Sequence, residues 1–249
     1  MNSTLADALA TGVVTDDAGC THQLRDHICA DEGVFLAGLL DENQITRALE
    51  VGCAMGISAM YICDALAKRT SPRHVVIDAF QSTTWHNTGI SNLRRAGHDF
   101  VDLVEELSEV ALPRMMAAGE RFEFALIDGM HTFDHTLIDF FYINRMLDVG
   151  GVVVFDDTQL PPVAKVVRYV LNYPGYELAG VVGDVFTWKR RLLDGAKRGL
   201  GAMTPELFKR EFLCPSTYAA QEPINPYASM VALRKTAEDD RSWNWYEPF

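Results

Sequence analysis

The chain has 249 residues, of which 48% are hydrophobic, and 34 acidic against 22 basic residues give it a formal net charge of −12. This length and apolar content predict one folded domain and exclude a mainly disordered chain. The acidic balance argues against a nucleic-acid partner, because phosphate binding requires a basic surface. Apolar runs fall far short of the roughly 18 residues that span a bilayer, so we expect no membrane insertion.

The cysteines and the N-terminal residues indicate the cellular compartment of the protein. Five cysteines are present, an odd number, and none has Cys-x-x-Cys spacing, which argues against a disulfide framework or a zinc knuckle. The first residues contain no Lys or Arg, and Asp7 interrupts their apolar run, so they do not resemble a signal peptide. We therefore expect a cytoplasmic protein.

Apolar and amphipathic segments alternate along the middle of the chain. Short apolar strands are expected at 47–51, 74–78, 100–106, 122–128 and 151–157. Amphipathic helices are expected between and after them at 57–69, 89–97, 108–119, 135–147 and 161–172. This alternation predicts an α/β fold with a doubly wound, mostly parallel sheet. Nearly continuous apolar runs suit strands that are buried on both faces.

Two flanks lie outside this alternation. Residues 1–45 are expected to form a helical N-terminal flank before a core at 46–188. Within the chain's second half, 176–188 and 228–235 look like two further strands. The stretch 189–228 is predicted to be an insertion that serves as a lid or an oligomer contact, and 229–249 supplies the last strand and a tail. We expect a homo-oligomer, in the simplest form a dimer.

The first strand runs from Glu50 into a glycine turn that contains Gly52 and Gly56. In an open parallel sheet, ligands bind beyond the carboxyl ends of the strands, and glycines there allow close approach of the backbone. The turn differs from Gly-x-Gly-x-x-Gly because Ala54 stands at the second glycine's place. The pattern alone is compatible with two interpretations: a turn that only packs against its neighbours, and a turn that binds a ligand.

Polar residues follow the second and third strands. Asp78 is well placed to accept both hydroxyls of a ribose, or to cap the next loop. Ser108 follows the third strand, and we favour it as the N-cap of the next helix while allowing contact with a base edge.

The fourth and fifth strand ends carry the strongest local signal. Asp128 ends one strand with His131 three residues later, and Asp156 and Asp157 end the next strand. Carboxylates that converge in one cleft repel each other unless they are protonated or neutralised by a cation, and such ligands suit Mg²⁺ or another hard divalent ion. An imidazole near its ordinary pKa is suited to accept a proton, although His131 could also be a surface residue or a ligand.

Taken in order, these motifs resemble the class I S-adenosylmethionine-dependent methyltransferases. The segments are ALEVGCAMGISAMYICDAL, VVIDAFQSTTWHNTGISNLRRAG, FALIDGMHTFDHTLIDF and GGVVVFDDTQLPPVAKVVRYV. The IDG-x-H strand end is similar to that of the small-molecule O-methyltransferase-like group, which has metal-dependent members. The resemblance spans about Gly33 to Asn172 together with the last strand, and it implies a seven-stranded Rossmann-like methyltransferase fold.

The resemblance also implies roles for individual residues. Bound S-adenosylmethionine would be contacted by Glu50, Gly52, Gly56, Asp78, Gln81, Trp85, Ser108 and Asp128. Among these, Gly52 and its turn would hold the methionine part, Asp78 the ribose, and Gln81, Trp85 and Ser108 would border the adenosine. A divalent cation, Mg²⁺ or another, would be held by Asp128, Asp156 and Asp157. His131 would be the catalytic base, with Asp128 as the second catalytic residue.

We therefore expect methyl transfer from S-adenosylmethionine to a hydroxyl oxygen of a small molecule such as a sugar, a phenol or a secondary metabolite. In this scheme a divalent ion lowers the pKa of the acceptor oxygen and His131 takes its proton. One alternative is a metal-independent O- or N-methyltransferase. An alternative from another class is a non-catalytic subunit that binds S-adenosylmethionine.

Overall fold

The computed structural model describes residues 2–183 and 228–246. All but the last residue of the insertion predicted at 189–228 therefore lie outside the described residues. Within the described ranges, no helix combines the length and apolar character that crossing a membrane requires.

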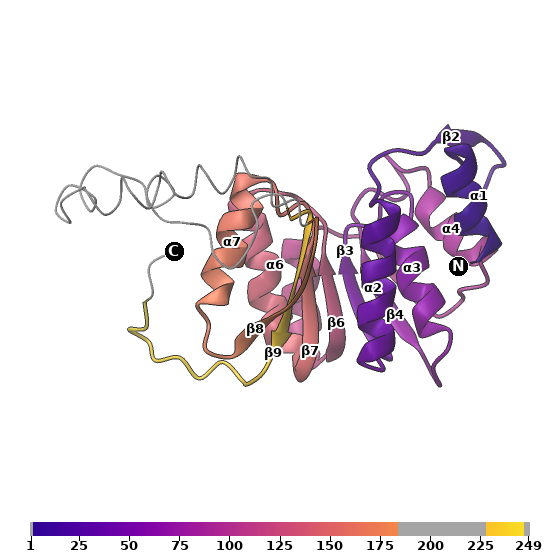
Figure 1. Ribbon diagram of the computed structural model, residues 1–249. Helices are drawn as coiled ribbons and strands as arrows, with labels where there is room; N and C mark the ends of the chain where they lie inside the picture. Colours follow the sequence, from indigo (N-terminus) through magenta and orange to yellow (C-terminus); the bar gives the residue numbers. More distant parts are fainter. Residues whose placement is uncertain (1, 184–227, 247–249) are drawn as a thin grey trace, which may run out of the picture.

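A seven-stranded sheet forms the centre of the described structure, in the order β5-β4-β3-β6-β7-β9-β8 (Figure 1). Its strands are β3 (Arg47–Val51), β4 (Arg73–Ile77), β5 (Val101–Val104), β6 (Phe122–Ile127), β7 (Leu147–Phe155), β8 (Tyr176–Val182) and β9 (Met230–Lys235). Strands β3 to β7 run parallel, whereas β9 is antiparallel to both of its neighbours. The predicted doubly wound, mostly parallel sheet is confirmed.

Helices cover both faces of this sheet (Figure 1). One face packs against α2 (Ala30–Glu42), α3 (Ile57–Leu66) and α4 (Thr88–Arg95), and the other against α5 (Ser108–Ala117), α6 (Phe133–Met146) and α7 (Pro161–Leu171). Side chains of β6 alternate between the two faces: Phe124 and Leu126 join the first core, and Ala125 and Ile127 the second. This period of two, with apolar residues on both faces, explains the continuous apolar run in the sequence.

The N-terminal flank differs from its helical prediction. Helix α1 (Ser3–Thr11) is followed by an antiparallel pair, β1 (Val13–Thr15) and β2 (Thr21–Gln23), before α2 begins. Gly12 ends α1 with a φ of 67°, and the β-branched residues after it favour a strand. In the connecting turn, the Asp16 carboxylate accepts a hydrogen bond of 2.8 Å from the backbone N–H of Cys20. The helical prediction was wrong for these residues because it overlooked this turn.

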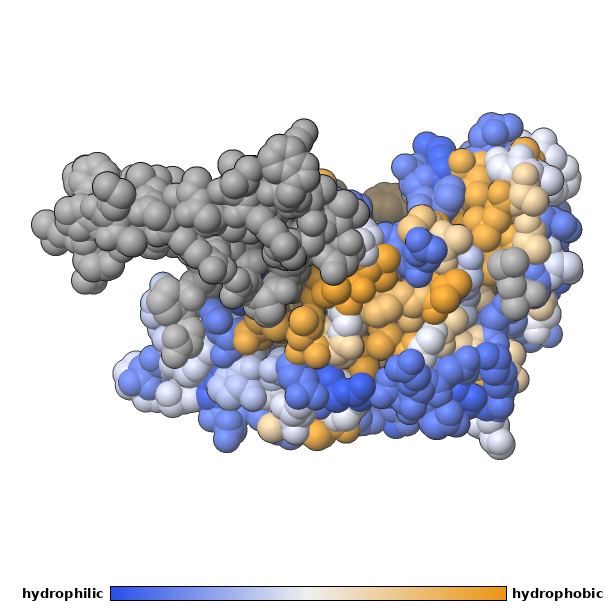
Figure 2. All heavy atoms as spheres, in the orientation of Figure 1, coloured by the Kyte–Doolittle hydropathy of each residue, from blue (hydrophilic) through white to orange (hydrophobic). Residues whose placement is uncertain are grey.

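Helix α2 and the edge strand β8 lie close together on one side of the molecule. A Cβ at Gly180 of β8 would lie 2.8 Å from the Phe35 ring of α2, so a larger residue there would displace this ring. Figure 2 shows many apolar residues on the side where these two elements lie, and Val34 of α2 is 65% exposed there.

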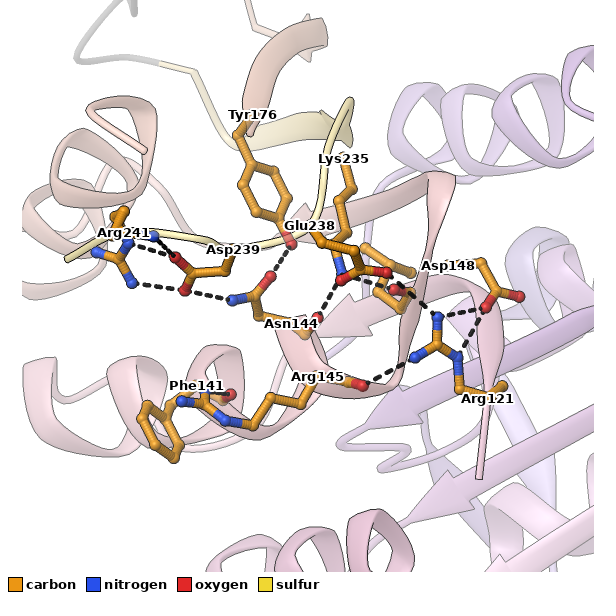
Figure 3. Close-up of polar contacts among 11 residues, drawn as sticks. Arg121, Phe141, Asn144, Arg145, Asp148, Tyr176, Lys235, Glu238, Asp239 and Arg241 are labelled. Carbon is orange, nitrogen blue, oxygen red and sulfur yellow. Dashed lines mark hydrogen bonds and ion pairs between the residues drawn. The ribbon is translucent and has the colours of Figure 1, made fainter. Parts of the chain in front are cut away.

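The amino ends of the parallel strands hold a network of paired charges. Lys235, at the end of β9, is fully buried, and its ammonium group donates to the carbonyl oxygens of Asn144 and Leu147, both at 2.9 Å. It also contacts Glu238 at 2.6 Å (Figure 3). Because these carbonyls lie where α6 ends and β7 begins, the lysine holds the C-terminal residues against that junction.

Candidate active site

A pocket of about 670 Å³ opens at the carboxyl ends of the parallel strands. Its volume is within the range of small-molecule sites. Most of its lining follows strands β3 to β7, and the segment just before α2 adds a further wall. Among the lining residues are Asp26, His27, Ile28, Gly52, Cys53, Ala54, Ser58, Asp78, Phe80, Trp85, Glu106, Leu107, Ser108, Glu109, Asp128, Met130, His131, His135, Asp156 and Asp157.

The glycine turn after β3 forms the floor of this pocket. Gly52 has a φ of +90°, and a Cβ there would overlap the backbone oxygen of Asp128. Gly56 has a φ of +82°, and a Cβ there would lie 2.8 Å from the backbone oxygen of Gly89. Both positions require glycine on steric grounds. Gly52 lines the pocket, whereas Gly56 lies behind it as the N-cap residue of α3.

Asp78 braces the turn from the end of β4. Its Oδ2 atom accepts hydrogen bonds from the backbone N–H groups of Cys53 at 3.1 Å and Ala54 at 2.9 Å. The same oxygen accepts a bond of 2.9 Å from Nε2 of Gln81, and Gln81 also donates to the carbonyl of Ala54 at 2.8 Å. Gln81 is fully buried behind the turn and does not line the pocket. Asp78 does line it, so its carboxylate both shapes the turn and faces the cavity.

A buried polar chain lies beneath the turn. Glu50 is fully buried and accepts a hydrogen bond from the hydroxyl of Ser58, which lines the pocket. Its other oxygen lies 3.1 Å from Nε2 of His74 in β4, and Nδ1 of His74 lies 3.3 Å from the sulfur of Cys63. Glu50 thus acts on the pocket through Ser58. Sequence analysis missed His74 because it looks like an ordinary strand residue.

Two predicted adenosine contacts line the pocket wall beside β4 and β5. Trp85 is half-buried, and the guanidinium of Arg25 lies 5.1 Å from its ring centre. Ser108 is the first residue of α5, and the N-cap is Leu107, so the predicted capping role of Ser108 is wrong. Ser108 lines the pocket from the start of α5.

The acidic residues and the histidine after β6 and β7 meet on the opposite side of the pocket. Nε2 of His131 lies 3.3 Å from Oδ1 of Asp128 and 3.5 Å from Oδ2 of Asp157. This nitrogen is buried, and among the described residues it has no hydrogen-bond partner of good geometry. Asp156 is buried and lies next to Asp128. The predicted convergence of these four side chains is therefore present.

The proximity of these groups changes their acidity. Burial, with the negative charge of Asp128 as the next cause, raises the pKa of Asp156 to about 10. The pKa of Asp128 is also raised by burial. The contact with Asp128 raises the pKa of His131 and outweighs the opposing effect of burial. The cluster therefore holds more protons near neutral pH than separate, exposed side chains would.

The same carboxylates were predicted to hold a divalent cation. By type they are suitable, because hard oxygen ligands bind Mg²⁺. By arrangement they are not: within residues 2–183 and 228–246, no group of three or more His, Cys, Asp or Glu side chains has the geometry to hold a metal ion. The His131 ring nitrogen approaches both Asp128 and Asp157. The Mg²⁺ site stays a prediction.

Sequence analysis also missed part of the pocket wall. Asp26, His27 and Ile28 come from the segment before α2, far in sequence from the strand ends, and no motif marks them. Nδ1 of His27 lies 2.8 Å from the carbonyl oxygen of Ile28. His135 also lines the pocket, with its Nδ1 atom 2.8 Å from the hydroxyl of Thr132. In the sequence, only the closeness of His135 to the predicted site residue His131, four positions earlier, could have indicated that it lines the pocket.

Comparison with known proteins agrees with this geometry. The profile of a family described as "Methyltransferase domain" matches residues 49–158. Comparison with curated protein sequences finds no match to the chain.

Several solved structures share the fold. An O-methyltransferase from Bacillus cereus in complex with SAH is 20% identical, with a TM-score of 0.58 over 72% of this chain and 83% of that one. Cofactor-bound Rv0187 from MTB is 23% identical, with a TM-score of 0.60 over 74% and 84% of the two chains. TomG from Streptomyces achromogenes, an O-methyltransferase of tomaymycin synthesis in complex with SAM, is 19% identical, with a TM-score of 0.56 over 72% and 82%. The methyltransferase-domain profile thus matches the part of the chain that runs from β3 to just beyond β7, and the chain shares its fold with these solved structures.

Proposed function

We propose that this enzyme transfers a methyl group from S-adenosylmethionine to a hydroxyl oxygen of a small molecule, such as a sugar, a phenol or a secondary metabolite. The observation that carries this proposal is the position of His131. His131 lines the pocket, and its Nε2 atom lies between two carboxylates, 3.3 Å from Oδ1 of Asp128 and 3.5 Å from Oδ2 of Asp157. An imidazole that lies beside carboxylates in a pocket is suited to take the proton of an acceptor hydroxyl, because the carboxylates stabilise the imidazolium that forms.

The cofactor fits the opposite part of the pocket. Gly52 leaves the floor free of side chains, and Asp78 faces the cavity where a ribose would bring its hydroxyls. Trp85 and Ser108 line the wall that we assign to the adenine ring. When bound, S-adenosylmethionine supplies an electrophilic methyl group. The bound structures of the Bacillus cereus and Streptomyces achromogenes proteins support this assignment.

The protein's own part in the reaction is to position the acceptor and to remove its proton. We assign His131 Nε2 as the base that receives the hydroxyl proton while the oxygen forms its bond to the methyl carbon. Asp128, 3.3 Å from this nitrogen, stabilises the resulting imidazolium. The walls of the pocket hold the two reactants in line, which supplies much of the rate acceleration.

Assistance by a divalent cation is the second form of this proposal. It is favoured by the two neighbouring carboxyl groups of Asp128 and Asp156, whose pKa values are raised mainly by burial. A cation held by Asp128, Asp156 and Asp157 would lower the pKa of the acceptor hydroxyl. The ligand geometry is absent from the described residues, so we derive no step through the ion.

A binding and turnover assay tests both forms. We expect the purified protein to bind S-adenosylmethionine and S-adenosylhomocysteine in calorimetry, and to transfer a labelled methyl group to at least one hydroxyl compound in a substrate panel. Asp78→Ala should weaken cofactor binding at least about tenfold, because the turn loses its brace. An exposed aspartate, Asp134→Ala, is the matched control.

Chelation separates the two forms. Turnover that persists in EDTA supports proton transfer to His131 alone, whereas turnover that EDTA abolishes and Mg²⁺ restores supports the metal site. A protein that binds neither cofactor form, or that binds the cofactor and methylates no hydroxyl compound, would contradict the proposed function.

A further inference from the structure

The chemistry proposed above gives no role to the pocket wall that precedes α2. This wall consists of Asp26, His27 and Ile28. Helix α2 leads into β3 at the amino ends of the strands, so its own first residues lie at the carboxyl ends, where the pocket opens. Burial raises the pKa of Asp156, and the charges of Asp128 and of Glu32, in the first turn of α2, add to this rise. The start of α2 therefore lies on the acidic side of the pocket.

The wall is held in place at both ends. Ile28 is 4% exposed and packs in the core between the sheet and its first layer of helices. Directly after it, the backbone N–H of Cys29 donates a hydrogen bond of 2.6 Å to the carboxylate of Glu32. At the other end, the guanidinium of Arg25 lies 5.1 Å from the ring centre of Trp85. The backbone between these anchors is therefore positioned before any ligand binds.

The hydrogen bond of the His27 ring determines where its proton is. Nδ1 of His27 lies 2.8 Å from the carbonyl oxygen of Ile28. Because a carbonyl oxygen can only accept, the neutral imidazole carries its proton on Nδ1 and has a free lone pair on Nε2. His27 is exposed and lines the pocket, so a ligand can reach this ring. It offers a hydrogen-bond acceptor on the wall of the pocket.

From this arrangement we propose that His27 is a specificity-determining residue for the methyl acceptor. Its Nε2 atom accepts a hydrogen bond from a second hydroxyl group of that molecule, one that is not itself methylated. The substrate class is then a compound with at least two hydroxyl groups, one that gives its proton to His131 and one that binds His27. The inference rests on the proposed function and specifies which small molecules the site selects.

The charges of the lining agree with a ligand that brings hydrogen-bond donors. Asp26 in the same wall and Asp157 beside His131 carry carboxyl groups, which can only accept hydrogen bonds when they are ionised. The described lining includes no lysine or arginine that would pair with an acidic substituent. A free hydroxyl group has a proton to donate in these surroundings, whereas a methoxy group in its place has none.

Pairs of probe compounds test this role. In each pair, one member has a second hydroxyl group and the other carries a methoxy group in its place. The pairs are 4-hydroxybenzyl alcohol with 4-(methoxymethyl)phenol, and cis-cyclohexane-1,3-diol with cis-3-methoxycyclohexanol. Near pH 8, where an imidazole of ordinary pKa is neutral, we expect kcat/KM for the diol to exceed that for its ether at least about fivefold, because one net hydrogen bond supplies a factor of that size.

Two histidine variants assign this preference. His27→Phe keeps an aromatic ring and removes the lone pair, so we expect the preference to fall below about twofold through a loss of kcat/KM for the diol. Its affinity for S-adenosylhomocysteine should stay within about twofold. The matched control is His86→Phe, because His86 is exposed and outside the described lining. Its ring stacks on His22 with centroids 4.9 Å apart, a contact that a phenyl ring retains, so this variant should keep the full preference.

The outcomes are distinguishable. Equal kcat/KM for diol and ether in the wild type, or a full preference in His27→Phe, would overturn the inference and leave the proposed function intact. A folded His27→Phe variant that loses affinity for S-adenosylhomocysteine would also overturn it, because the wall would then belong to the cofactor site. A wild type that binds no cofactor, or methylates no hydroxyl compound, would instead contradict the proposed function. Circular dichroism shows whether His27→Phe is folded, and His27→Ala replaces it if it is not.

Discussion

The two ends of the parallel strands use charged residues in opposite ways. At the amino ends, acidic side chains lie beside arginine or lysine. These contacts are Arg47 with Glu123 and Asp148, Arg73 with Glu120, Arg121 with Asp148, and Lys235 with Glu238. Each of these distances is 3.2 Å or less. Figure 3 shows the part of this network around Asp148 and Lys235.

At the carboxyl ends, the pocket is lined by acidic side chains, and its described lining includes no lysine or arginine. The acidic residues are Asp26, Asp78, Glu106, Glu109, Asp128, Asp156 and Asp157. Glu106 reaches an arginine outside the lining, Arg114, at 2.7 Å. Asp128 and Asp157 lie beside the imidazole of His131, and Asp157 also accepts a hydrogen bond of 2.6 Å from the side-chain amide of Gln159.

This difference separates charges that stabilise the fold from charges that are available to ligands. Paired groups at the amino ends satisfy each other and the ends of the backbone elements. At the carboxyl ends, Asp128 and Asp156 have raised pKa values, and groups with shifted pKa values cluster at functional sites. Each of the following substitutions tests whether charged residues at one end of the strands serve activity or stability.

Removing the base at the carboxyl ends should have the largest effect. In His131→Ala, we expect kcat for the methyl transfer to fall about 10²–10⁴-fold, because general base catalysis contributes a factor of that size. The affinity for S-adenosylhomocysteine should stay within about threefold, since the assigned cofactor wall does not include His131. Steady-state kinetics and calorimetry measure the two quantities.

His135→Ala is the matched control for this variant, because His135 lines the same pocket and lies four residues further along the chain. We expect it to retain most of the turnover. If both variants lose activity equally, the assignment of His131 as the base is contradicted, because its position between Asp128 and Asp157 would then have no special role.

The sequence alone predicted the sheet and the convergence of Asp128, His131, Asp156 and Asp157, because parallel strands bring their carboxyl ends to one edge. It did not predict the wall formed by Asp26 to Ile28, since that contact depends on how the N-terminal pair β1 and β2 folds back. For a similar reason the sequence did not predict that the Gln81 amide donates to Asp78 and to the carbonyl of Ala54, and the contact of Gln81 with adenosine stays a prediction. Side-chain direction in a loop depends on tertiary contacts that motif spacing does not contain.

Breaking the buried pair at the amino ends should lower stability instead of activity. Lys235→Met removes the donor from the carbonyls of Asn144 and Leu147, which lie in a buried environment. We expect the free energy of unfolding to fall by about 3 kcal/mol, the cost of leaving such groups without a partner. Urea unfolding measures this change, and kcat of the folded variant should be unaltered.

An exposed lysine provides the control for this variant. Lys68 contacts Asp41 at 2.6 Å, but its side chain is 56% exposed. Lys68→Met should cost less than about 1 kcal/mol. Equal losses in the two lysine variants would show that burial at the amino ends contributes nothing beyond an ordinary surface pair.

Replacing Asp139, beneath the carboxyl ends, should raise the free energy of unfolding, whereas the lysine substitutions lower it. Its pKa rises from 3.8 to about 6 on folding, so the folded state binds more protons than the unfolded state between these values. Stability conferred by the neutral form is therefore lost as the pH rises through about 6, and the loss reaches about 3 kcal/mol above it. Asp139→Asn should raise the free energy of unfolding near pH 8 by up to this amount.

The gain should disappear near pH 4, where the wild-type carboxyl group is itself protonated in the folded protein. Urea unfolding at the two pH values measures the difference. A gain of the same size at both pH values would mean that the amide improves packing, and that ionisation of Asp139 is not the cause.

The smallest effect is expected at an exposed pair of the amino ends. Arg73 contacts Glu120 through two guanidinium nitrogens, at 2.5 and 3.2 Å, and Asp102 at 3.3 Å, but its side chain is 39% exposed. Arg73→Gln should therefore cost less than about 1 kcal/mol in unfolding free energy, because solvent screens the pair. This cost should shrink further in 1 M salt, where the screening length is only about 3 Å.

A larger cost that salt does not change would assign a different role to this arginine. Its guanidinium lies 5.9 Å from the ring centre of Phe122, which is 1% exposed at the start of β6. In that case packing over the ring, and not charge pairing, would hold this part of the amino ends together. The two ends of the strands would then differ in side-chain packing as well as in charge pairing. In that case Arg73→Met should be more stable than Arg73→Gln, because the methionine side chain can still pack over the ring.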